Sequence, residues 1–198
     1  MTGARIETNE RAEEARSQCP IVISHYSDYT PPFDPVPVIQ RMLASVPPKY
    51  LVGLSEIVLT NSTGLSRKLR RSVTKSRKRK VKIVEARGLY RQAWHGKPAW
   101  IQIFVNNTLK NWGKGWWLRF TFFAEILLGD VLFHEIGHHI HFTARPEHRE
   151  KEEVADDWMR RLKKNYFRTQ RPMLRFVLIT LRPILRPMIW LLRRKAAR

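Results

Sequence analysis

The chain has 198 residues, 43% of them hydrophobic, which is enough for one domain with a core of its own. It carries 37 lysines and arginines against 17 aspartates and glutamates, and the formal net charge of +20 favours an anionic partner such as nucleic acid, a membrane surface or an acidic protein. The single cysteine, Cys19, excludes an internal disulfide, and the N-terminal residues lack the apolar core of a signal peptide, so we expect a cytoplasmic protein.

Residues 1–35 are expected to form a flexible, proline-rich segment. The first part of this segment is polar without a clear period. Its end, together with the two residues after position 35, reads DYTPPFDPVP (residues 28–37) and holds four prolines that favour an extended chain. Val38, Met42 and Val46 then recur at four-residue spacing, which predicts a short amphipathic helix. Two consecutive prolines end this helix, because proline cannot continue it.

Three β-rich stretches follow, at residues 50–60, 81–94 and 99–107, the second of them interrupted near Gly88. A basic run at 67–82 lies between the first two and carries ten basic residues of sixteen. One interpretation of the run is a solvated basic loop, which would occupy residues 62–80. The other is an arm that binds nucleic acid.

Two helices are expected in the C-terminal half. The first spans about residues 118–142, and Asp130 could cap a fresh helical start after a glycine. Pro146 forces a break in the chain. A second helix at about 147–165 places Val154, Trp158 and Leu162 on one face.

The pattern HEIGH at residues 134–138 is the first sign of chemistry. His134 and His138 are four residues apart, so on a helix both rings can reach one metal ion, and Glu135 lies beside them, where a carboxylate can take a proton from water. The alternative is a polar helix whose histidines are merely solvated. That alternative does not explain why the histidines are embedded in apolar sequence, namely Val131, Leu132, Phe133 and Ile136.

A zinc ion needs a third protein ligand. His141 has a suitable helical angle, but it lies roughly 10 Å from His134 along the axis, because a helix rises about 1.5 Å per residue. Glu152 is better placed, because a fold-back near Arg145 would bring it level with the second histidine. Its neighbour Glu153 is nearly level too but points away from the apolar face. Asp156, one turn after Glu152, can accept a hydrogen bond from a ligand histidine.

With HEIGH followed by EEVADDW, the chain resembles the gluzincin zinc metallopeptidases, and within them the minigluzincins and the phage-repressor-cleaving peptidases. The resemblance covers about residues 36–165. It implies a zincin-like α+β domain, in which a short three-stranded twisted sheet packs on the motif helix and on the glutamate helix. It also implies that the sheet's edge strand beside the cleft binds the peptide substrate, and IQIFVNN (residues 101–107) would be that strand.

By the same resemblance, the protein is expected to be a zinc-dependent metallopeptidase that acts on a peptide or protein. His134, His138 and Glu152 would be the Zn²⁺ ligands, Glu135 the catalytic base, and Asp156 a support for a ligand histidine. Oxyanion stabilisation needs a further side chain, for which the candidates are Tyr90, His141 and His148. The alternative function is a catalytically inactive binding protein on the same scaffold, which would hold nucleic acid or an anionic membrane through its basic loop and tail.

Residues 166–198 are expected to form a basic amphipathic tail, because eight basic residues between 161 and 193 fall on one narrow stripe of a helical projection. Arginines within the apolar stretch argue against a membrane span. The tail could lie on an anionic membrane at its inner face, pack on the domain or on a partner chain, or bind nucleic acid.

Overall fold

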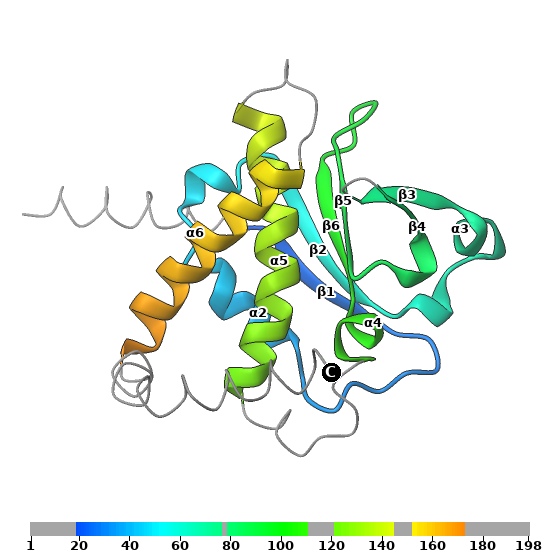
Figure 1. Ribbon diagram of the computed structural model, residues 1–198, viewed down its shortest axis with the longest axis horizontal. Helices are drawn as coiled ribbons and strands as arrows, with labels where there is room; N and C mark the ends of the chain where they lie inside the picture. Colours follow the sequence, from blue (N-terminus) through cyan, green and yellow to red (C-terminus); the bar gives the residue numbers. More distant parts are fainter. Residues whose placement is uncertain (1–18, 77–78, 111–120, 145–151, 173–198) are drawn as a thin grey trace, which may run out of the picture. The chain divides into compact units, whose positions relative to one another are not determined.

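The computed structural model describes residues 19–76, 79–110, 121–144 and 152–172 (Figure 1). Within these residues the fold is α+β, with a mixed four-stranded sheet, a separate two-stranded sheet, five α-helices and three short 3₁₀ helices. The chain divides into two compact units, Met1–Lys163 and Lys164–Arg198. The candidate site lies in the first unit.

The larger sheet has the strand order β1-β2-β6-β5. β1 (Ile21–His25), β2 (Leu54–Thr60) and β6 (Ala99–Phe104) run parallel to one another, and β5 (Gly88–Arg91) pairs antiparallel with β6. β5 is therefore one edge of the sheet and β1 is the other. The central strands are the most buried, because β2 and β6 each have a neighbour on both sides.

β1 corrects two predictions, since the sheet has four strands instead of three and residues 21–25 are not part of a flexible segment. The strand is short and mostly exposed, with Ile21 and Ile23 both open to solvent. An edge strand of this kind has only a weak hydrophobic pattern. Its backbone pairing with Glu56 to Thr60 of β2 holds it in the sheet.

The predicted strand at 99–107 is also wrong at its end, because β6 stops at Phe104 and α4 (Val105–Leu109) follows. Two asparagine side chains of α4 are used in tertiary hydrogen bonds. Asn106 Oδ1 accepts from the backbone of Ser62, and Asn107 Nδ2 donates to two carbonyl oxygens of the segment before β5. These bonds turn the chain out of the sheet at this point.

The predicted basic loop at 62–80 is regular structure instead. It contains a 3₁₀ turn (Ser62–Gly64), α3 (Arg67–Arg71) and the strands β3 (Val73–Ser76) and β4 (Arg79–Lys82), which pair as an antiparallel hairpin. The predicted strand at 81–94 is correspondingly divided. Its first residues belong to β4, Ile83–Glu85 forms a 3₁₀ turn, and β5 follows.

α5 (Thr121–Ala144) is the central helix, and it contacts α2 (Val36–Leu43), α4, β5 and β6 (Figure 1). It runs unbroken through Asp130, so the predicted helical restart there is wrong. The helix is apolar on nearly all sides, as expected for one that is surrounded by protein. Its buried Glu125 accepts a hydrogen bond from Arg41 of α2 at 3.3 Å.

α6 (Glu152–Gln170) begins beside the middle of α5. The two helices approach closely at Gly137, where an added Cβ would lie 2.7 Å from the carbonyl oxygen of Ala155. Residues 166–170 of the predicted tail continue α6, and the rest of the predicted tail helix, from 173, lies outside the described residues. Among the helices that the structure describes, none combines the length and the apolar character needed to cross a membrane.

Candidate metal centre

His134 and His138 lie one turn apart on α5 and direct their rings to the same point. Their Nε2 atoms are 3.1 Å apart, and their ring planes are nearly perpendicular, at 88°. His138 is buried and His134 is partly exposed, with a side-chain exposure of 20%. The four-residue spacing therefore produces the convergence that the sequence predicts, with one histidine open to solvent.

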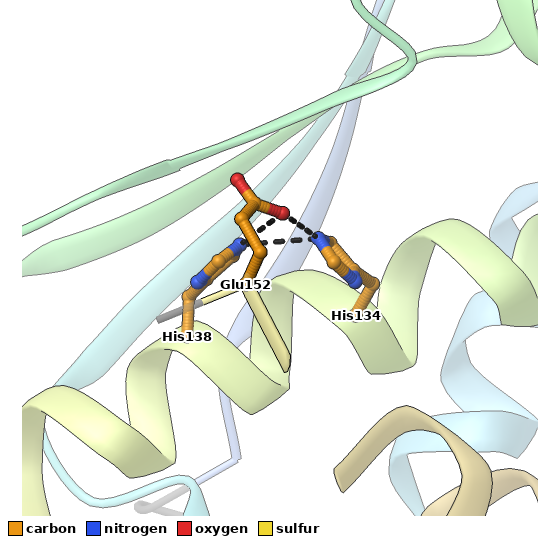
Figure 2. A group of neighbouring side chains, drawn as sticks. All are labelled: His134, His138 and Glu152. Carbon is orange, nitrogen blue, oxygen red and sulfur yellow. Dashed lines mark hydrogen bonds and ion pairs between the residues drawn. The ribbon is translucent and has the colours of Figure 1, made fainter. Parts of the chain in front are cut away.

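Glu152, at the start of α6, completes a group of three side chains (Figure 2). Its Oε2 atom lies 3.3 Å from His134 Nε2 and 4.0 Å from His138 Nε2. Ligands at 2.0–2.1 Å from a tetrahedral zinc ion are separated from one another by roughly 3.3 Å, by simple geometry. The three separations in this histidine–glutamate cluster bracket that value.

The close crossing at Gly137 explains how Glu152 reaches the two histidines. Ala155 is one turn after Glu152, and its backbone lies against Gly137, the residue before His138 on α5. A side chain at 137 would separate the helices, because the atoms in its way belong to the backbone. Glu153, the alternative ligand, points to solvent.

Asp156 lies on the outer side of His134, with its Oδ1 atom 3.0 Å from His134 Nδ1. A carboxylate in this position accepts a hydrogen bond from the Nδ1–H group of the ring. The proton therefore stays on Nδ1, and the lone pair of Nε2 is directed at Glu152. Burial, and then the neighbouring His138, lower the pKa of His134, and the two carboxylates only partly oppose them. The neutral ring is thus favoured, with its Nε2 lone pair facing Glu152.

The group fits a metal ion on this evidence. Two acceptor atoms, His134 Nε2 and Glu152 Oε2, face each other at 3.3 Å, which is favourable only with a proton or a cation between them. A low histidine pKa disfavours the proton. Two imidazole nitrogens and one carboxylate are also the ligand set that zinc takes in catalytic sites with three protein ligands.

Glu135 is buried between α5 and the edge strand β5. An added Cβ at Gly88 would lie 2.5 Å from Glu135 Oε1, so the carboxylate rests directly against the backbone of that strand. The sequence pattern predicts only an interrupted strand at Gly88. A glycine within a strand often marks such a close approach, and this signal could have identified the contact.

β5, and not β6, is the edge strand beside α5, which corrects the prediction for residues 101–107. β6 is enclosed between β2 and β5, so its backbone groups are already paired on both sides. The order of the strands is decided by pairing between distant segments, and the sequence pattern of IQIFVNN does not contain that information. An extended peptide could pair only with an edge strand such as β5.

His139 has a structural position that the sequence analysis missed. It is buried, with Nε2 3.0 Å from the carbonyl oxygen of Val52 and Nδ1 3.1 Å from the hydroxyl of Tyr90. The carbonyl can only accept, so Nε2 donates to it and Nδ1 accepts from the tyrosine. Burial lowers the pKa of His139, which agrees with a neutral ring.

The three candidates for oxyanion stabilisation are placed differently. Tyr90 is on β5, and its hydroxyl is hydrogen-bonded to His139. His141 is buried near the end of α5. His148 lies outside the described residues.

Comparisons with known proteins add no relative. No protein-family model, no curated protein and no solved structure matches the chain. The candidate metal centre therefore depends on its own residues and geometry, together with the sequence motif.

Proposed function

We propose that the protein is a zinc-dependent metallopeptidase that hydrolyses a peptide bond in a peptide or protein substrate. The observation that carries the proposal is the convergence of His134, His138 and Glu152 within 4.8 Å of one another, beside a buried Glu135 on the same helix. A structural cluster of histidines needs no neighbouring carboxylate base. A hydrolytic site does, because a proton must move from the attacking water to the leaving amine.

Each residue has a defined task in this proposal. His134, His138 and Glu152 would hold the zinc ion, which when bound polarises the scissile carbonyl and lowers the pKa of water. Glu135 accepts a proton at its carboxylate and later delivers it to the leaving nitrogen. Asp156 keeps the proton on His134 Nδ1, so that Nε2 of this ring stays available as a ligand.

The ligand set can be tested by metal analysis of the purified wild type beside Glu152→Ala and Glu153→Ala. The two glutamates are adjacent and acidic, but only Glu152 reaches the histidines. We expect about one zinc per chain in the wild type and in Glu153→Ala. Glu152→Ala should lose most of it. A normal zinc content in Glu152→Ala would show that the ligand assignment is wrong.

The catalytic assignment is tested separately by Glu135→Gln. This variant keeps the size of the side chain but cannot accept the proton, so zinc content should be retained while hydrolysis of a peptide library falls at least about 100-fold, the lower end of the usual effect of a general base. The matched control is Glu153→Gln, at an exposed position. Equal hydrolysis by Glu135→Gln and wild type would contradict a peptidase that uses this base. No hydrolysis by a zinc-loaded wild type would favour an inactive scaffold.

A further inference from the structure

Residues 66–82, in which the structure describes α3 and the paired strands β3 and β4, are here called the basic module. The module contains ten lysines and arginines, and no acidic residue occurs between Glu56 and Glu85. The excess of positive over negative charge in so short a stretch is far above that of an ordinary solvated surface, where charges of both signs are interspersed. The metal centre makes no use of it.

The basic module is folded and is attached to the sheet. Ser66 caps α3, and Arg70 donates to the carbonyl oxygens of Leu65 and Thr63, which fixes the helix to the preceding turn. The carbonyl oxygen of Ser72 accepts from Ile83 N at 3.0 Å and closes the hairpin. The cations are thereby presented on a defined surface. Ile83 is buried in an apolar cluster that includes Ala86, Leu89 and Phe104.

Four cations of the module, among the side chains that the structure describes, face solvent without acidic partners. Within the ranges that the structure describes, no ion pair joins an acidic side chain to four exposed residues, Arg67, Lys68, Arg71 and Lys82. These four side chains are therefore available to an anionic partner.

We infer that the basic module is a docking surface for double-stranded DNA, which it holds through the phosphate backbone. A two-stranded ribbon or a short helix fits the major groove of a duplex, whose two walls both carry phosphates. The backbone of the paired strands Val73–Ser76 and Arg79–Lys82 supplies such a ribbon, and α3 supplies a short helix directly before it.

The composition of the module argues against two other partners. It contains no tryptophan, tyrosine or phenylalanine, so it lacks the aromatic platform on which single-stranded bases stack. Without aromatic residues it also lacks the interfacial anchors of a membrane-bound helix, and it has few bulky apolar side chains to insert into lipid. Its exposed apolar side chains are Leu69 and Val73. Charge therefore dominates the surface.

The docking surface is separate from the metal centre. Figure 1 shows α3 and the hairpin beyond β5, on the side away from α5. Binding of a duplex should accordingly be unaffected by Glu135→Gln or by removal of metal with a chelator. The inference thus stands or fails independently of the proposed function.

The test measures binding of a labelled 20-base-pair duplex to the full chain by fluorescence anisotropy over a series of KCl concentrations. The module variant is Arg67→Gln/Lys68→Gln/Arg71→Gln/Lys82→Gln. The control removes the same charge at four other exposed cations, with the substitutions Lys49→Gln/Lys97→Gln/Lys110→Gln/Arg160→Gln. Circular dichroism checks that all chains are folded. Vesicles of phosphatidylserine are titrated in parallel.

We expect the module variant to bind the duplex at least about 10-fold more weakly. A plot of the logarithm of the association constant against log [KCl] should also become less steep by roughly two to four, because each lost phosphate contact accounts for about 0.9 of the slope. The control should stay within about 3-fold of wild type. An equal loss in both variants would show that only net charge matters. A loss confined to the vesicles would assign the surface to lipid instead. Either result overturns the inference.

Discussion

The metal centre and the basic module place charged residues in opposite ways. In the metal centre, polar side chains from two helices converge in a partly buried site and contact one another, as His134 contacts Glu152 and Asp156. In the module, the cations come from one short stretch of sequence, and those whose side chains the structure describes face solvent. The first arrangement depends on tertiary packing and should be sensitive to single atoms. The second depends on local composition and should tolerate single changes.

The largest effect is expected at the helix crossing, from Gly137→Ala. The added methyl group would lie 2.7 Å from the carbonyl oxygen of Ala155. A backbone carbonyl cannot move aside as a flexible side chain can, so α5 and α6 must separate. We expect loss of zinc and a fall of about 1–3 kcal/mol in the free energy of unfolding, as for other overpacked sites. Inductively coupled plasma analysis and urea unfolding measure the two.

Gly129→Ala is the matched control, because it makes the same change in the same helix. The nearest atom to its added methyl group is a side-chain carbon of Met42 at 3.5 Å, which is an ordinary contact. Zinc should be retained, and stability should rise by about 0.5–1 kcal/mol, since alanine favours a helix over glycine. If both variants kept zinc equally, the close crossing would not be what assembles the cluster.

A smaller and more selective effect is expected from Gly88→Ala on β5. Its methyl group would lie 2.5 Å from Glu135 Oε1, and this carboxylate must move. Zinc content should be unchanged, whereas hydrolysis should fall by about 100-fold, the usual result of a misplacement of about 1 Å. Full activity together with full zinc content would mean that the position of Glu135 does not limit the reaction.

The smallest effect is the change in stability that we expect from the four glutamine substitutions in the basic module. These side chains are exposed and have no acidic partner within the described residues, so the free energy of unfolding in urea should change by less than about 0.5 kcal/mol. A loss as large as that of Gly137→Ala would remove the contrast between the two regions. It would indicate that the module is part of the packed fold.

Much of the metal centre could be predicted from the sequence, because its key relations are local. Four-residue spacing places His134 and His138 on one face of any helix, and the same spacing places Glu152 and Asp156 together on the next. Pro146 predicts a break between the two helices. Their ligand roles stay predictions until metal is measured, but the four side chains do lie together.

The sheet was predicted less well, because strand pairing joins residues far apart in the chain. The mostly exposed β1 gave a weak pattern and was assigned to a flexible segment. The edge position was given to residues 101–107, although β5 occupies it. Hydrophobic alternation identifies the face of a strand that is buried, but it does not identify its neighbours.

The total charge, its concentration in residues 67–82 and the helical faces that carry the histidines and acids follow from the order of residues along the chain. Three contacts do not follow from it: Gly137 brings α6 against α5, Gly88 lies on Glu135, and His139 links α5 to Val52 and Tyr90. Composition and helical periodicity are fixed by neighbours along the chain. Close contacts between backbones are fixed by which distant segments meet, and that is settled by packing of the whole domain.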